Sequence, residues 1–180
     1  MNIVVYGTTD VRPVIYTLLK FCQSLGDTAL FTSDRHYTRL LSSEVDVGSF
    51  ENIFIAITEL YPDEVFSTLD ISPDEFEFTI YDNKIPEEYD LFIHVVGCAE
   101  TETEKETMEL VDEYETINIG YGGMKGVPYS VDLFKHVEEI EGFRALREVD
   151  SKLTRAMAPM LSRLTNMPIQ TVRKVVAKKR

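Results

Sequence analysis

The chain lacks two features that would place it in a membrane or a secreted scaffold. No apolar run approaches the roughly 20 residues that a bilayer span requires, and only two of the 180 residues are cysteine, Cys22 and Cys98. Disulfide-stabilised secreted domains carry more cysteines than this. The first residues also lack the basic segment and small-residue cleavage site of a signal peptide. We therefore expect a globular cytoplasmic protein with no transmembrane segment.

Acidic residues are absent from the last thirty residues, 151–180, which hold eight basic ones. The other ten basic residues share residues 1–150 with all 31 acidic ones, so that part has a formal charge of −21. Such a separation of charge usually means that the basic part meets an anion. The acidic part would repel phosphate groups, so nucleic acid is not expected to cover most of the surface.

Short apolar runs alternate with helical patterns along residues 1–148. Strands are predicted at 2–6, 28–31, 52–57, 76–81, 90–96 and 116–119, and helices at about 10–25, 35–42, 100–115 and 130–142. This alternation is typical of a mostly parallel sheet with right-handed crossovers. We predict a three-layer, Rossmann-like α/β domain over residues 1–148 and a basic helical extension over 149–180. The strand at 90–96 should be central, and the strand at 76–81 is a candidate edge strand.

The loop after the first strand is the first candidate ligand site. Ligands of open α/β sheets bind at the carboxyl ends of the strands, and a helix N-terminus favours anions. The loop is Gly7-Thr8-Thr9-Asp10-Val11-Arg12-Pro13. It has one glycine and no lysine, whereas a phosphate-cradling loop needs several glycines and a lysine. The alternatives are an ordinary capped turn at Thr8, Thr9 and Asp10, a phosphate or nucleotide site, and a protein contact.

Other candidate chemistry is sparse. Asp34 follows the second strand, and the glycine-rich loop with Gly120, Gly122 and Gly123 follows the last strand, so these residues join the candidate ligand set. His94 and Cys98 at the end of a strand do not make up the three or four ligands of a zinc site, and we predict no metal. We expect His94 to be a hydrogen-bonded core or rim residue, and the run of acids in 100–106 to be a solvated face.

The front of the chain resembles the MinD/ParA-type ATPases in pattern. The resemblance covers a strand ending at Gly7, a helix ending in Leu25-Gly26, a strand ending at Asp34, and the later strand 89–95. Asp34 matches the family's catalytic-type aspartate. The paired lysines and glycines of the phosphate loop are missing, and His94 or Val95 stands where the family has a metal-side aspartate. The resemblance implies a degenerate, non-hydrolysing pseudo-ATPase that keeps the fold and its partner-binding surfaces.

The middle of the basic tail resembles the helix-turn-helix of bacterial DNA-binding proteins. Leu161 and Leu164 would lie on a first helix that begins at Pro159, and Asn166 stands at the turn. Asparagine tolerates the left-handed conformation that a tight turn needs, and Pro168 suits the start of the second helix. The candidate nucleic-acid contacts are Arg163, Gln170, Thr171, Arg173, Lys174, Lys178, Lys179 and Arg180.

Alternatives to nucleic-acid binding remain for the tail. Its helices would instead pack on the sheet with their basic ends solvated, dock on a partner protein, or lie on a membrane surface. Contact with a membrane is not expected, because the apolar face formed by Ile169, Val172, Val175 and Val176 is small and lacks aromatic residues.

The sequence thus predicts a non-catalytic adaptor or scaffold, without a cofactor, that binds protein partners through its body and DNA through its tail. One alternative is a nucleotide-dependent switch or enzyme that uses residues 7–13. Another is a self-assembling structural protein in which the acidic body of one copy meets the basic tail of the next, an arrangement that closes into rings or grows into filaments.

Overall fold

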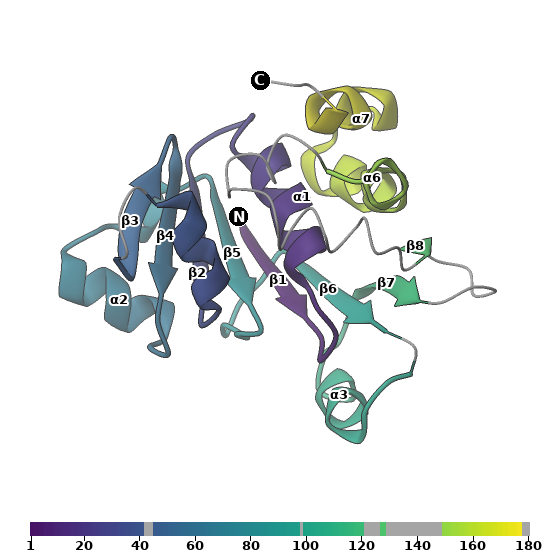
Figure 1. Ribbon diagram of the computed structural model, residues 1–180, viewed down its shortest axis with the longest axis horizontal. Coiled ribbons are helices and arrows are strands. Elements are labelled where there is room, and N and C mark those ends of the chain that lie inside the picture. The colour runs from purple at the N-terminus through teal and green to yellow at the C-terminus, as the bar shows by residue number, and fades with distance from the viewer. Residues whose placement is uncertain (42–44, 98, 121–126, 129–148, 178–180) are drawn as a thin grey trace.

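The computed structural model describes residues 1–41, 45–97, 99–120, 127–128 and 149–177, and the account below is confined to them. Within these residues, eight strands form one sheet in the order β3-β4-β2-β5-β1-β6-β7-β8 (Figure 1). They are β1 (Asn2–Tyr6), β2 (Thr28–Thr32), β3 (Val47–Phe50), β4 (Ile53–Ile57), β5 (Phe78–Asp82), β6 (Leu91–Val96), β7 (Glu115–Gly120) and β8 (Val127–Pro128). All neighbours pair in parallel except β3 and β4. The predicted mostly parallel α/β sheet is confirmed.

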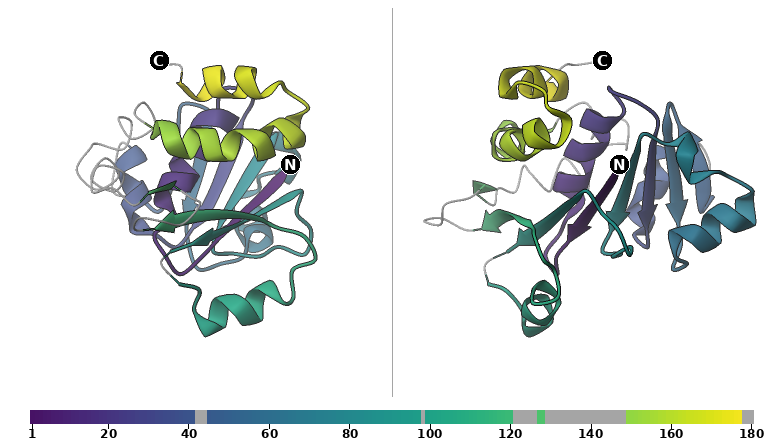
Figure 2. Two further views of the ribbon diagram at one scale, coloured as in Figure 1. Left: turned by 90° about the vertical axis from the view of Figure 1, so that its right-hand side faces the viewer. Right: turned by 180° about the vertical axis from the view of Figure 1, so that it is seen from behind.

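Helices lie on both faces of the sheet and complete three layers (Figure 2). One face carries α1 (Arg12–Cys22), α6 (Ser151–Thr165) and α7 (Ile169–Ala177), and the other carries α2 (Pro62–Leu69) and α3 (Glu102–Met108). Two short 3-10 helices also occur: η1 (Arg35–Leu40) between β2 and β3, and η2 (Pro73–Glu75) between α2 and β5.

Alternation along the strands divides the apolar core into two clusters. In β1, Ile3 and Val5 belong to the cluster under α1, whereas Val4 belongs to the cluster under α2 and α3. Successive side chains of a strand point to opposite faces, so a strand buried on both faces is apolar at nearly every position. This explains why the continuous apolar runs of β1, β2, β4 and β6 were recognisable in the sequence.

Several elements differ from the predictions. The candidate edge strand, β5, lies between β2 and β1 and is buried along its whole length. The strands at the two edges of the described sheet, β3 and β8, were not predicted. The β3 segment contains glycine and serine and is only partly buried; it forms a hairpin with β4 through Glu51, which has a φ of 53°. Helix α2 was also missed. The predicted helix at 130–142 lies outside the described residues.

The boundaries of α1 and α3 also shift. Helix α1 ends at Cys22 rather than near Gly26, so Leu25 is 38% exposed and is not part of its apolar face. Its N-cap is Val11, without a side-chain cap, although the Asp10 carboxylate accepts a hydrogen bond from the Arg12 amide. Helix α3 ends at Met108 and is therefore shorter than the acidic run that predicted it.

The C-terminal helices pack on the body. Helix α6 runs through Pro159, which was expected to begin a helix; the helix begins earlier because the Asp150 carboxylate caps the amides of Lys152 and Leu153 at 2.7 and 2.8 Å. Leu161 of α6 and Val172 of α7 are fully buried in the same cluster as α1. Such apolar burial stabilises the docked position. None of the described helices combines the length and apolarity of a membrane span.

Candidate functional site

A crevice of about 340 Å³ opens at the carboxyl ends of β1, β2 and β5. It is lined by Thr9, Asp10, Val11, Arg12, Ser33, Asp34, Asp82 and Asn83. Parallel strands end at the same edge of the sheet, so loops from distant parts of the sequence meet there. The predicted residues Asp10, Arg12 and Asp34 are thereby brought together, and Gly7 and Thr8 precede them in the same loop.

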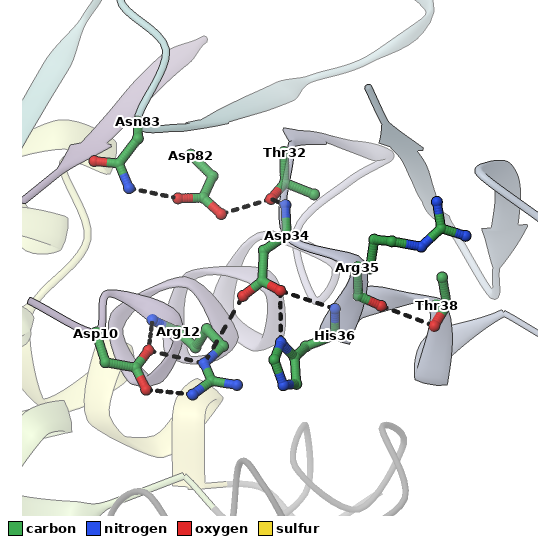
Figure 3. Close-up of polar contacts among 9 residues, drawn as sticks. All are labelled: Asp10, Arg12, Thr32, Asp34, Arg35, His36, Thr38, Asp82 and Asn83. Atoms are coloured by element: carbon green, nitrogen blue, oxygen red, sulfur yellow. Dashed lines mark hydrogen bonds and ion pairs between the residues drawn. The ribbon is translucent and has the colours of Figure 1, made fainter. Parts of the chain in front are cut away.

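Arg12 lies between two carboxylates (Figure 3). Its Nε donates to Asp10 Oδ1 at 2.8 Å and its Nη2 to Asp10 Oδ2 at 2.5 Å, which is a bidentate pair. The carboxylate of Asp34 is 3.9 Å from Nε on the other side. A guanidinium matches a carboxylate in this geometry, so the cation predicted to attract a phosphate is committed to protein carboxylates.

Asp34 is held at the start of η1. Its Oδ1 accepts hydrogen bonds from the backbone N of His36 at 2.9 Å and lies 2.6 Å from the His36 Nδ1. The Asp34 amide donates to Thr32 Oγ1 at 2.9 Å. Asp34 therefore caps η1, which is a structural role that its place after β2 does not reveal.

Asp82 is a buried carboxyl at the base of the crevice. Burial is the main cause that raises its pKa to about 6; the nearby carboxylates of Asp34 and Asp10 add to the rise, and hydrogen bonds from Thr32 and Asn83 oppose it. The Thr32 hydroxyl donates to Asp82 Oδ2 at 2.6 Å. A carboxyl in this setting holds a proton to higher pH than an exposed one.

The backbone amides of the β1 loop are also occupied. The Gly7 amide donates to Asn83 Oδ1 at 2.9 Å, and the Thr8 amide donates to Glu104 Oε1 at 2.9 Å. Glu104 is almost fully buried, and its other oxygen accepts the Thr101 amide at 2.6 Å. Burial by itself would raise the pKa of Glu104, but the hydrogen bonds from Thr101 and Thr8 outweigh it and the pKa is lowered. A protein carboxylate thus occupies a donor that a phosphate would need.

Gly7 is required by close packing. A Cβ at this position would lie 2.2 Å from the carbonyl oxygen of Val95 in the neighbouring strand β6. The absence of a side chain therefore lets the β1 loop approach strand β6 closely. This reason for the glycine differs from the one considered in the sequence, in which the backbone wraps around a phosphate.

His94 is fully buried, but it is not the hydrogen-bonded histidine that was predicted. Neither ring nitrogen has a hydrogen-bond partner in the part of the chain that the structure describes. Nδ1 lies 3.7 Å from Glu100 Oε1, and Nε2 lies 3.8 Å from Glu104 Oε1. Among the described residues, no group of three or more His, Cys, Asp or Glu side chains could hold a metal ion. Cys98 lies outside these residues.

The predicted ligand residues of the glycine-rich loop do not line the crevice or lie outside the described residues. Gly120 ends β7, which is separated from β1 by β6, and it does not line the crevice. Gly122 and Gly123 are outside the described residues. Asp82, Asn83 and Glu104 were missed. For Asp82 and Asn83 the signal was available, because polar residues that directly follow a buried strand lie at the carboxyl edge.

The docking of the tail on the body leaves some of the predicted nucleic-acid residues exposed and places another in an ion pair. Gln170, Arg173 and Lys174 are exposed on α7, and Thr171 is half-buried. Arg163 on α6 forms an ion pair with Glu115 of β7. The turn residue Asn166 has φ 55° and ψ 21°, the left-handed conformation predicted for it. Lys178, Lys179 and Arg180 lie outside the described residues, and the helix-turn-helix stays a prediction.

Solved structures resemble this chain only at low sequence identity. No family model matches it, and no curated protein matches it. Two similar solved structures are the MinC:MinD cell division protein complex and the MinD cell division protein, both from Aquifex aeolicus. Each is 10% identical to this chain and covers 99% of it, with 97% and 98% of the other chain covered and TM-scores of 0.45 and 0.44. The weak MinD-like resemblance seen in the sequence is to the same kind of protein.

Proposed function

We propose that the protein is a non-catalytic adaptor that binds protein partners through its acidic body and nucleic acid through the exposed face of α7. The occupation of the β1 loop by the protein's own side chains is the observation that supports the non-catalytic part. Amides at such a loop bind phosphate when they are free. Here the Thr8 amide donates to Glu104 and the Gly7 amide to Asn83.

Charge at the crevice adds to this argument. Three aspartates, Asp10, Asp34 and Asp82, line the crevice together with Arg12, whose guanidinium is paired with Asp10. A triphosphate would have to displace the Glu104 carboxylate from Thr8 and then face these acids. Repulsion of this kind between like charges in a partly buried site is costly. The crevice therefore disfavours the alternative of a nucleotide-dependent switch or ATPase-related enzyme.

Thermal unfolding in the presence of nucleotide tests the non-catalytic part. We expect millimolar ATP or GTP with Mg²⁺ to leave the Tm of the whole chain unchanged, because a ligand that does not bind the folded state does not stabilise it. A rise of several degrees would contradict the proposal and favour the switch.

The exposed face of α7 supports the nucleic-acid part. Val172 and Val176 face the core, so Gln170, Arg173 and Lys174 are left on the surface of the helix. Basic side chains on an exposed helix supply the phosphate contacts of DNA-binding proteins. A cytoplasmic location and the binding of protein partners belong to this proposal, whereas self-association is an alternative to it.

A gel-shift assay with matched charge variants tests this part. We expect Arg173→Gln with Lys174→Gln to weaken binding of duplex DNA at low salt on the order of tenfold, because two phosphate contacts are lost. The control is Lys152→Gln with Arg155→Gln, which removes the same charge from the exposed side of α6. Equal weakening by both pairs, or no binding by the intact protein, would refute the assignment to α7.

A further inference from the structure

A second pocket lies at the opposite end of the sheet from the crevice and has no role in the function considered so far. Its volume is about 810 Å³, and it is bounded by the starts of β1, β6 and β7 and by one side of α6. This volume is within the range of about 300–1,000 Å³ that is typical of ligand pockets. We name it the amino-end pocket.

Acidic side chains surround the amino-end pocket. They are Glu87, Glu88, Asp90, Asp112, Glu113 and Glu115. Asp90 accepts a hydrogen bond from the Asn2 amide and Glu115 is paired with Arg163, but the side chains of the other four form no hydrogen bond or ion pair within the described residues. These four are exposed at the rim, and their charges are available to a ligand from outside.

The pocket also has apolar and aromatic walls. Leu91 and Phe92 come from β6, and Met160 and Leu164 from α6. Tyr114, which is 41% exposed, stands beside the acidic rim. Aromatic faces attract cations, and a mixture of apolar walls with a few charges is typical of a binding pocket rather than of a solvated acidic surface.

One cation already occupies a wall of this pocket. The guanidinium of Arg163 reaches from α6 to the carboxylate of Glu115 at the start of β7. It is a basic residue in the pocket lining, set among six acids. The protein's own arginine shows that a guanidinium can pair with a carboxylate of this lining.

We propose that the amino-end pocket binds a segment of a partner protein in which arginine or lysine alternates with apolar residues. Its cations would meet the four rim acids that have no partner among the described residues, and its apolar side chains would meet the half-buried Leu91 of β6 and Leu164 of α6. This proposal rests on the adaptor function and names a surface for the protein partner.

A second copy of this chain is a poorer fit than another protein. The exposed cations of its α7, Arg173 and Lys174, are accompanied on that helix by only one exposed large apolar residue among those described, Ile169. Val172 and Val176 are buried against the body and cannot contact a second copy. The face of α7 would meet the acids of the pocket but leave its apolar walls uncovered.

Binding of a short fluorescein-labelled peptide in which arginine and leucine alternate, followed by fluorescence anisotropy, tests the proposal. Arg163→Met removes the internal competitor and is expected to tighten binding about threefold. The control is Arg155→Met, which removes the same charge from an exposed position on the same helix outside the pocket. Equal tightening by both variants would mean general attraction to a more negative protein and would overturn the proposal.

A second pair of variants tests the rim. Asp112→Asn with Glu113→Gln is expected to weaken binding about fivefold, whereas Asp74→Asn with Glu106→Gln, which changes the same charges at exposed positions elsewhere, should change it less than about twofold. All four positions are on the surface, so the variants are expected to fold. Equal weakening, or no binding of the peptide by the unmodified protein, would overturn the proposal.

Two further readouts separate this proposal from its alternatives. Sedimentation that shows self-association abolished by the Asp112 and Glu113 variants would identify a second copy as the occupant and overturn the assignment to another protein. The gel shift of duplex DNA should be unaffected by these variants, since they leave α7 intact. Peptide binding that does not depend on Asp112 and Glu113, together with an intact gel shift, would reject this inference alone. Stabilisation by ATP would reject the non-catalytic function alone.

Discussion

At the carboxyl ends of β1, β2 and β5 the carboxylates are engaged by protein donors, whereas at the amino-end pocket most of the rim acids have no partner among the described residues. Glu104 and Asp82 accept hydrogen bonds from the Thr8 amide and the Thr32 hydroxyl. Asp112 and Glu113 line the larger cavity and are exposed. The two ends of one sheet thus differ in whether their acidic side chains are hydrogen-bonded to other parts of the protein.

This difference matters because buried and exposed carboxylates contribute to different properties. A buried, hydrogen-bonded carboxylate stabilises a fold only while its donors remain in place. Removing one partner leaves the other buried and unpaired, which lowers the free energy of unfolding. An exposed carboxylate contributes little to stability but remains available for binding. We infer that the carboxyl end is a structural element and that the amino end is the more suitable place for a ligand.

The largest effect is expected from Gly7→Ala, which tests how tightly the carboxyl end is packed. A Cβ there would lie 2.2 Å from the Val95 carbonyl oxygen, and backbone must move to relieve the contact. We expect the free energy of unfolding to fall by about 3 kcal/mol. Urea denaturation measures it. The control is Gly48→Ala, whose Cβ would lie 3.2 Å from the flexible end of Leu41 and should cost less than about 1 kcal/mol.

A smaller effect is expected when single acids at the two ends are compared. Glu104→Ala deprives the Thr8 and Thr101 amides of their acceptor, and we expect a loss of about 2 kcal/mol in the free energy of unfolding. Glu113→Ala at the amino-end pocket removes an exposed acid and should change it by less than about 0.5 kcal/mol. Equal effects in urea denaturation would remove the distinction between the two ends.

The smallest of the three effects depends on pH. Because burial raises the pKa of Asp82 from its ordinary value of 3.8 to about 6, the folded state binds more protons than the unfolded state between these values. The contribution of Asp82 to the free energy of unfolding therefore falls as pH rises through this range. Between pH 5 and pH 7.5, both above the sequence pI of 4.6, the loss should be about 1–2 kcal/mol.

Asp82→Asn isolates this contribution, since asparagine does not titrate. The stability of the variant relative to the unmodified protein should rise by about 1–2 kcal/mol from pH 5 to pH 7.5. Asp74→Asn, at an exposed position, serves as the control and should show no such trend. A constant difference between Asp82→Asn and the unmodified protein would mean that Asp82 is not held protonated by burial.

Parts of the fold were predictable because their physical cause is local. The apolar runs of β1, β2, β4 and β6 are buried on both faces, so each carries its own signal. The left-handed turn at Asn166 was predictable from the conformational tolerance of asparagine. Strand β3 was not, because an edge strand with glycine and serine has only a weak pattern of its own.

The candidate site was predictable only in its position. Asp10, Arg12 and Asp34 follow strands whose ends meet, which placed them at one edge of the sheet. Their partners were not predictable. The Arg12 guanidinium pairs with Asp10, and Glu104, which the sequence placed on a solvated acidic face, is buried and accepts the Thr8 amide.

The sequence by itself determined the layered α/β architecture, the separation of charge and the edge of the sheet where the β1 loop lies, because periodicity, composition and chain order are properties of the chain. Only the tertiary structure decided that α6 and α7 dock on α1, that Glu104 occupies the β1 loop and that acids surround a pocket at the other end. The partner of a polar group is supplied by segments far away in the chain, and its free energy depends on burial that exists only once those segments have packed.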